Sequence, residues 1–197
     1  SGIDLKSVCS PLEGHPRSEL YEIVSAPYEP PPPGREERHH GVDFSYYARG
    51  ERASIQGVGV QAILPGSAAA ALAESFPYGN IVIVETPGDA LAEDLRSALG
   101  LGEGESLYTL YAHLDAPSGL VQGDPVMTCQ LLGQVGKSGN AGVAHLHMET
   151  RVGPSGAVFP VLGFYLADHS EEEREAYLRW RTSGLFRHFD PMTLLVE

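Results

Sequence analysis

The sequence AHLHME at residues 144–149 is the stretch that decides the predicted fold and function. Successive side chains of a β-strand alternate between two faces, so His145 and His147 share one face and Leu146 and Met148 the other. Two imidazoles on one face form half of a metal site, or else they are an ordinary pair of surface or core histidines. The choice depends on whether other parts of the chain supply the missing ligands.

A second stretch, His39 to Asp43, offers those ligands. The two residues are four apart, an even spacing that places both on one face of an extended segment, and Gly41 between them has no side chain to obstruct an ion. One nitrogen, one oxygen and a third ligand from His145 or His147 make a three-ligand zinc site with a position open for water, which is typical of catalytic zinc. The remaining histidine of the pair His145 and His147 is then free for acid–base chemistry. Two histidines and a carboxylate also form the facial triad of non-haem iron oxygenases, so iron is the alternative metal.

Composition limits the other classes of function. A chain of 197 residues, 42% hydrophobic, can bury one core with some additions. Its net charge of -13, with 13 Lys+Arg against 26 Asp+Glu, argues against nucleic-acid binding. No apolar run approaches the ~20 residues that cross a bilayer, and no leader pattern opens the sequence. We therefore expect a soluble portion of a protein whose export signal or anchor, if it has one, lies outside this sequence.

The two cysteines, Cys9 and Cys129, are too far apart in sequence for the close pairs that bind zinc through thiolates. Their even number permits one disulfide joining the N-terminal segment to the body of the domain, which would suit an oxidising compartment. Two unrelated buried thiols are the alternative.

The remaining pattern is mostly that of short strands between turns rich in glycine and proline, which predicts an antiparallel β-sheet or sandwich. Strands are expected over residues 19–25, 57–64, 80–85, 107–114 and 125–135, while residues 67–75 fit either a helix or a strand. A short helix is predicted from Asp89, as N-cap, to Leu99, with Gly100 as the stop. A second helix follows a capping box formed by Ser170 and Glu173.

These elements suggest one domain with additions. Residues 1–38, which contain a proline run that favours extended backbone, form an N-terminal extension packed on the domain. The core spans residues 39–164 and carries an insertion at about 87–106, whose helix we expect to form a wall of the binding groove. Residues 165–197 form a C-terminal helix and tail.

Taken together, the motifs resemble those of the lysostaphin-like zinc endopeptidases, a family that includes murein endopeptidases. In order, they are His39-x-Gly41-x-Asp43-Phe44, Val60-Gln61-Ala62, Tyr78-Gly79-Asn80, Tyr111-Ala112-His113-Leu114, Gly123-Asp124-x-Val126, Gly133-Gln134-Val135-Gly136-x-Ser138-Gly139, His145-Leu146-His147-x-Glu149 and Asp190-Pro191. The resemblance covers roughly residues 39 to 152. It implies a mainly β, lysostaphin-like fold.

The resemblance also implies a site. Zn2+ would be bound by His39, Asp43 and His147, and the catalytic residues His113 and His145 would flank its open position. The implied function is a zinc-dependent endopeptidase that hydrolyses peptide bonds in peptidoglycan cross-links or stem peptides, in an extracytoplasmic location. The alternative is a latent or inactive family member that serves as a cell-wall binding or activating module.

Several residues depart from the family pattern or lie outside it. Cys129 occupies a position that is usually glycine, and Val143-Ala144 replaces the usual Gly-Pro. We expect His40 to pack internally or touch solvent. Three further histidines are expected at the surface: His15, His169 and His188.

Overall fold

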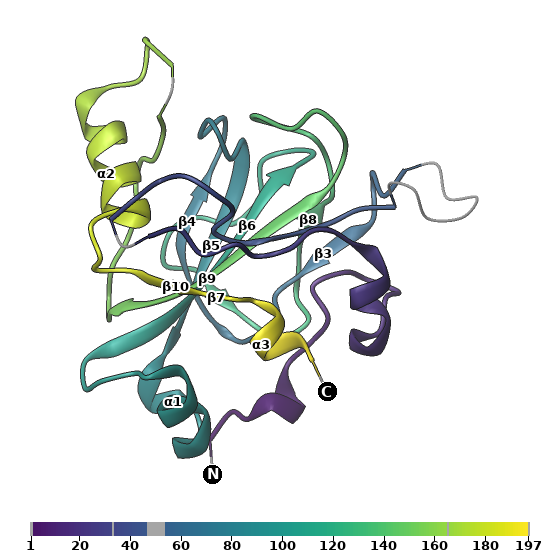
Figure 1. Cartoon of the computed structure of the whole chain (residues 1–197), viewed down its shortest axis with the longest axis vertical. Helices are drawn as coiled ribbons and strands as arrows, with labels where there is room; N and C mark the ends of the chain where they lie inside the picture. Colours follow the sequence, from purple (N-terminus) through teal and green to yellow (C-terminus); the bar gives the residue numbers. More distant parts are fainter. Residues whose placement is uncertain (1, 33, 47–53, 165, 197) are drawn as a thin grey trace.

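An antiparallel β-sheet forms the centre of the molecule in the computed structural model, which describes residues 2–32, 34–46, 54–164 and 166–196 (Figure 1). The sheet comprises β1 (Val24–Ala26), β2 (Val42–Phe44), β4 (Gly66–Leu72), β5 (Asn80–Pro87), β6 (Glu105–Leu114), β7 (Pro125–Val126), β9 (Leu146–Pro154) and β10 (Arg187–Phe189). Its order is β1-β2-β9-β6-β5-β4-β7, with β10 also paired to β9. A smaller sheet pairs β3 (Gly59–Gln61) with β8 (Leu131–Gln134). The predicted mainly β, antiparallel fold is confirmed.

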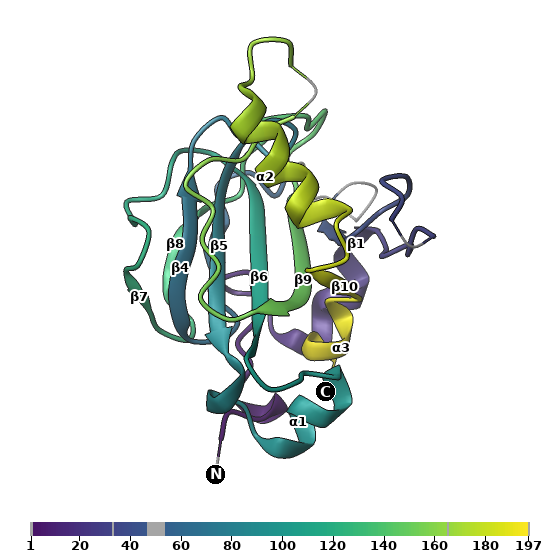
Figure 2. The same cartoon turned by 90° about the vertical axis from the view of Figure 1, so that its left-hand side faces the viewer.

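Both faces of the central sheet are covered, as the alternation along β5 illustrates. Val82 and Val84 point into a core shared with the N-terminal segment, β3 and β8. Ile81 and Ile83 point the other way, into a second core that includes residues of a C-terminal helix. That helix is α2 (Glu171–Arg181), which lies against its face of the sheet in Figure 2. A strand buried on both faces needs apolar residues at every position, which explains the continuous apolar run from 81 to 84.

The helix α2 forms as its sequence predicts. The Ser170 side chain accepts a hydrogen bond from the Glu173 backbone N–H, and the Glu173 carboxylate accepts one from the Ser170 N–H. This capping box satisfies two of the otherwise unpaired donors at the start of the helix. Tyr177 and Trp180 lie on the buried face of α2. The remaining helices are α1 (Glu93–Leu99), α3 (Met192–Leu195) and the 3-10 helices η1 (Leu5–Ser7), η2 (Arg17–Ile23) and η3 (Gly88–Ala90).

The helix predicted from residue 89 begins later, at Glu93. Asp89 lies in η3 instead, and Ala92 is the N-cap of α1, without a side-chain cap. The reason is tertiary, because backbone hydrogen bonds between Ile3 and residues 90 and 92 keep the intervening chain extended. Gly100 ends the helix in a left-handed conformation with φ 67°, as predicted.

Two other local predictions are settled by burial. Residues 67–75, which fit either a helix or a strand, contribute β4, where Ala68, Ala69 and Ala70 are buried in the sheet. The strand predicted for residues 19–25 is mostly wrong, since η2 ends at Ile23 and only β1 is extended. Leu20 and Ile23 project from η2 into the core, and this burial stabilises a helical turn over a sequence that alternates weakly.

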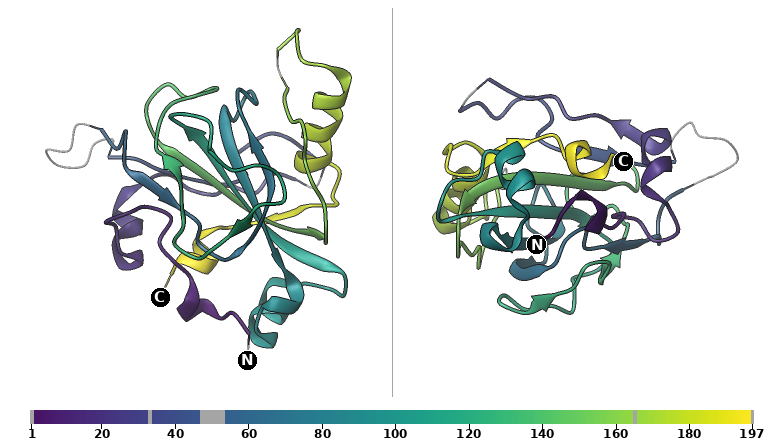
Figure 3. Two further views of the ribbon diagram at one scale, coloured as in Figure 1. Left: turned by 180° about the vertical axis from the view of Figure 1, so that it is seen from behind. Right: turned by 90° about the horizontal axis from the view of Figure 1, so that it is seen from below.

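The N-terminal segment is fastened to the domain at several points. Cys9 and Cys129 form a disulfide, and Cys129 has φ 62°, a left-handed conformation that glycine adopts more easily. At the other end of the chain, the Arg17 guanidinium donates to the carbonyls of Leu194 and Val196, so this segment runs beside α3 (Figure 3). None of the helices in the described ranges is both long and apolar enough to cross a membrane.

Candidate metal centre and the surrounding pocket

The two histidine-containing stretches are brought together by the pairing of β2 with β9. Asp43 lies opposite His147 in the register, and His39 lies just before β2. Gly41 permits this close approach, because a Cβ at that position would lie 2.3 Å from the Met148 carbonyl oxygen. The role of Gly41 is therefore to let two backbones meet, rather than only to leave room for an ion.

Three side-chain atoms converge at this junction. His39 Nε2 lies 3.1 Å from Asp43 Oδ1 and 3.2 Å from His147 Nδ1, and His147 Nδ1 lies 2.8 Å from Asp43 Oδ1. All three candidate ligand atoms lie within 4.8 Å of one another. Two imidazole nitrogens and one carboxylate oxygen suit a tetrahedral zinc ion with one position left for water. The residues present therefore fit the metal that the motifs imply.

The electrostatics of these groups follow from their closeness. Burial opposes ionisation of Asp43, but hydrogen bonds from His147 and His39 outweigh it and hold the pKa of Asp43 well below its ordinary value. Burial likewise disfavours protonated His147, yet hydrogen bonds to Asp43 and Glu149 raise its pKa to about 9. In the metal-free protein a proton therefore sits where a cation would be held, and metal binding must displace it.

The outer nitrogen of each candidate imidazole ligand is also held in place. His39 Nδ1 donates to the carbonyl oxygen of Pro27 at 2.8 Å, and His147 Nε2 donates to Glu149 Oε1 at 3.0 Å. Such contacts fix the ring orientation and the tautomer that presents the other nitrogen to a metal. Both candidate imidazole ligands are therefore preorganised.

His113 and His145 lie beside this junction with their rings 4.6 Å apart. His113 Nδ1 donates to the Ser138 carbonyl at 2.7 Å, and His145 Nδ1 donates to the Val143 carbonyl at 2.9 Å. In each ring this leaves Nε2 for other chemistry, and His145 Nε2 is 3.7 Å from Asp43 Oδ2. The structure thus brings all five predicted site residues together.

His113 is unusual in its backbone and its charge. Its φ of 60° is left-handed, a conformation that is costly for a non-glycine residue and is found most often at functional sites. Burial, together with the neighbouring charges of His147 and His145, lowers its pKa to about 3. His113 is therefore neutral at physiological pH, with Nε2 able to accept a proton or a hydrogen bond.

Glu149 is the buried centre of a hydrogen-bond network behind His147. Its Oε1 accepts from His147, Tyr78 and Arg181, and its Oε2 accepts from Trp180 and twice from Arg151. These partners, the Arg151 charge foremost, overcome burial and hold the pKa of Glu149 well below its ordinary value. Sequence reasoning assigned Glu149 no role, although the same period-two alternation places it and Arg151 on the face of His147.

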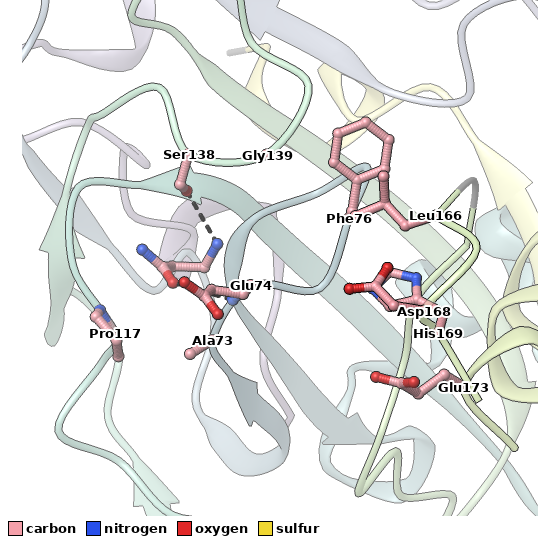
Figure 4. A pocket seen from close by; sticks show the side chains of 11 residues that line it. Ala73, Glu74, Phe76, Pro117, Ser138, Gly139, Leu166, Asp168, His169 and Glu173 are labelled. Carbon is pink, nitrogen blue, oxygen red and sulfur yellow. Dashed lines mark hydrogen bonds between the residues drawn. The ribbon is translucent and has the colours of Figure 1, made fainter.

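One cavity contains the site, and a second cavity, lined by none of the five predicted residues, lies next to it. One, of about 260 Å³, contains the five predicted site residues together with Arg38, His40, Pro77, Tyr78, Asn140 and Arg181. A larger one, of about 810 Å³, lies beside it and is shown in Figure 4, with Ser138 and Gly139 on one side and Asp168, His169 and Glu173 on the other. Both are therefore bordered by the C-terminal addition.

The groove-wall role predicted for the helix in the insertion is wrong. Residues 87–106, all within the described part of the chain, line neither cavity. The insertion joins β5 to the start of β6, whereas His113 lies at the far end of β6, about 25 Å along the strand. Figures 1 and 2 show α1 and α2 at opposite ends of the molecule.

The four histidines outside the site are all at least partly buried, which fits one of the two alternatives predicted for His40. His40 packs internally, accepting from Arg151 Nη2 at 2.9 Å through its Nδ1. The surface position predicted for His188 is wrong, because the pairing of β10 with β9 places its ring 4.8 Å from that of His40, with Tyr28 Oη at 2.6 Å. His15 and His169 are half-buried rather than fully exposed, His15 against Tyr46.

Comparison with known proteins places these features in a family. The sequence model described as Peptidase family M23 matches residues 37–159, whereas no match was found among curated proteins. A putative peptidase M23 from Pseudomonas aeruginosa is 17% identical with a TM-score of 0.53, covering 99% of this chain and 52% of its own. The present chain therefore spans about half the length of that protein, and the likeness shows the fold.

Two further solved structures are similar over a shorter part of the chain. The catalytic domain of lysostaphin from Staphylococcus simulans is 25% identical, covering 70% of this chain and 86% of its own, with a TM-score of 0.46. A mutant catalytic domain of the prophage-encoded M23 protein EnpA from Enterococcus faecalis is 22% identical, covering 69% and 85%, with a TM-score of 0.47. The family match spans more than half of the chain and confirms the resemblance found in the motifs. This chain belongs to peptidase family M23.

Proposed function

We propose that the chain is a zinc-dependent endopeptidase that hydrolyses peptide bonds in peptidoglycan cross-links or stem peptides. Membership of a peptidase family supports hydrolysis of a peptide bond. The single observation that carries the proposal is the convergence of His39 Nε2, Asp43 Oδ1 and His147 Nδ1 beside two further histidines. A purely structural zinc site would be closed by a fourth protein ligand and would need no such pair.

The proposed roles follow from the hydrogen bonds of each residue. His39, Asp43 and His147 would hold the zinc ion. When bound, zinc lowers the pKa of a coordinated water to about 7 and polarises a peptide carbonyl. His113 and His145 both keep Nε2 directed away from their backbone acceptors, so they can take up a proton, stabilise a developing oxyanion or pass a proton to the leaving amine. The proposal assigns these steps to the pair jointly.

The accessibility of the site supports an active enzyme over a latent one. The side chains of His39 and Asp43 remain 24% and 19% exposed, and that of His145 remains 13% exposed. Arg38 of the N-terminal extension and Arg181 of α2 line the smaller cavity, and the candidate ligands beside them stay partly exposed. A substrate backbone can therefore approach from solvent.

The location proposed is extracytoplasmic. A disulfide persists in oxidising compartments and is rare among cytosolic proteins, and Cys9 and Cys129 are joined by one. Peptidoglycan is reached from the same side of the membrane. The disulfide and the proposed substrate therefore point to the same compartment.

Mass spectrometry of fragments released from defined muropeptides tests the proposal and also identifies the bond that is cut. Zinc-loaded protein should release peptides, and chelation or His147→Ala should abolish release. Intact muropeptides after incubation with fully zinc-loaded protein would contradict the proposed activity. Metal analysis of protein purified without added metal separates zinc from iron, and iron would favour the oxygenase-type alternative.

A further inference from the structure

The outer contacts of the candidate imidazole ligands come partly from outside the family region, residues 37–159, which is the part of the chain that the family model matches. Trp180 and Arg181 of α2 lie beyond that region and both donate to Glu149, which in turn accepts from the candidate ligand His147. Only Glu149 therefore separates these two α2 side chains from the candidate ligand His147.

Glu149 is fully buried, and side-chain donors surround both of its carboxylate oxygens. An ionised carboxylate removed from water is tolerated only when its oxygens are filled by donors. Arg151, on the same strand, supplies both Oε2 contacts from within the family region, at 3.0 and 2.8 Å. Trp180 Nε1 also donates to Oε2, at 2.9 Å, while Arg181 Nη1 donates to Oε1 at 3.3 Å. Tyr78 Oη also donates to Oε1, at 2.6 Å, so the two α2 donors complete a set of contacts to which Tyr78 and Arg151 also belong.

The same helix also holds the chain segment that leads to the other candidate imidazole ligand. Tyr177 Oη donates to Glu36 Oε1 at 2.6 Å, and Arg181 Nη2 donates to the Glu36 carbonyl oxygen at 3.1 Å. Glu36 is three residues before His39. Arg181 therefore connects both sides of the site, since one of its amino groups contacts Glu149 and the other contacts this segment.

We infer that Trp180 and Arg181 are positioning residues of the metal centre: through Glu149 they fix the ring of His147 so that Nδ1 faces the metal. The inference rests on the proposed zinc site. It extends that site to a helix beyond the family region, and it distinguishes α2 from a helix that only covers the sheet. Trp180 also packs among Phe159, Tyr108 and Phe186, so the test must separate its N–H from its ring.

The experiment compares variants that remove donors and leave bulk. Trp180→Phe removes the indole N–H, and Arg181→Met removes the guanidinium while Arg181→Lys keeps a charge and a donor. Arg179→Met is the matched control, because Arg179 lies on the same helix but contacts the Val158 carbonyl and the Phe159 ring. Each variant is prepared free of metal, and its dissociation constant for zinc is measured by competition with a chromophoric chelator. Thermal unfolding shows whether each variant is folded.

Loss of an outer contact of a metal ligand weakens metal binding by about 10- to 100-fold. Trp180 and Arg181 act through Glu149, so we expect the zinc dissociation constant to rise by about tenfold, the lower end of that range, in Trp180→Phe and Arg181→Met. It should partly recover in Arg181→Lys and stay within twofold of wild type in Arg179→Met. Folded donor variants that bind zinc like wild type would overturn the inference. So would equal weakening in Arg179→Met, which would indicate a general effect of helix stability.

The outcome also separates this inference from the proposed function. If Arg181→Met does not fold, Trp180→Phe and Arg181→Lys decide by the same thresholds. Wild-type protein that binds no zinc would overturn both proposals. Wild-type protein that binds zinc in a manner dependent on α2, but cuts no muropeptide, would support the positioning role and contradict the peptidase activity.

Discussion

Gly41→Ala tests whether the close approach of β2 to β9 builds the metal centre. The new Cβ would lie 2.3 Å from the Met148 carbonyl oxygen and 3.0 Å from both His147 Cε1 and Glu149 Cγ. Ordinary contacts begin at 3.4 Å, so the strands must separate by about 1 Å. The obstacle is backbone, which cannot turn aside as a flexible side chain would.

The separation of the strands affects both the stability of the fold and the affinity for zinc. Overpacking of this kind destabilises by about 1–3 kcal/mol. Because β2 carries Asp43 opposite His147, a 1 Å displacement also exceeds the ~0.2 Å tolerance of metal–ligand distances. We expect zinc affinity to fall by about 10- to 100-fold, in the range found when ligand positioning is disturbed.

Urea denaturation of metal-free protein measures the first effect through the fluorescence of Trp180, the only tryptophan. A loss of ~2 kcal/mol with a slope of ~2 kcal/mol/M lowers the midpoint by about 1 M. Chelator competition measures the second effect. Gly119→Ala is the control, because a Cβ there meets no atom within 4 Å. A Gly41→Ala protein equal to Gly119→Ala in both midpoint and zinc affinity would refute the reasoning.

Three further outcomes are expected. His147→Ala should abolish zinc binding and cleavage, whereas His113→Ala should keep zinc and lower kcat by about 10²–10⁴-fold; loss of zinc from His113→Ala would contradict this division. The hydrogen-bonded Arg187 guanidinium lowers the pKa of Glu105 from 4.5 to about 2. The pair therefore stabilises the fold fully above pH 4.5 and loses this effect as the pH falls toward 2. The difference in urea midpoint between wild type and Arg187→Met should shrink over that pH range. Reducing the disulfide, which spans 120 residues, should lower the free energy of unfolding by up to about 4 kcal/mol, measured by urea titration with and without reductant.

The candidate site was largely predictable because its signals are local and periodic. The alternation of His145 with His147 depends only on extended backbone, which β9 provides from Leu146 onward. The spacing from His39 to Asp43 assumes the same backbone, whereas residues 40 and 41 form a bend and β2 begins at Val42. The choice of His147 over His145 as the third ligand rested on family resemblance. The geometry groups His147 with His39 and Asp43, although alternation alone places both histidines on the same face.

The sequence by itself determined the mainly β fold, the capped helix α2 and the small group of residues from which the candidate ligands come, because alternation, capping and ligand spacing each act within a few residues. Tertiary structure alone decided that the insertion lies at the far end of β6, that His188 is half-buried, and that Glu149 is held by donors from α2. These outcomes depend on which strands pair and which helix covers which face. Such contacts join residues far apart in the chain, as between Tyr28 and His188, which are 160 positions apart, and a contact over that distance leaves no periodic pattern in either segment.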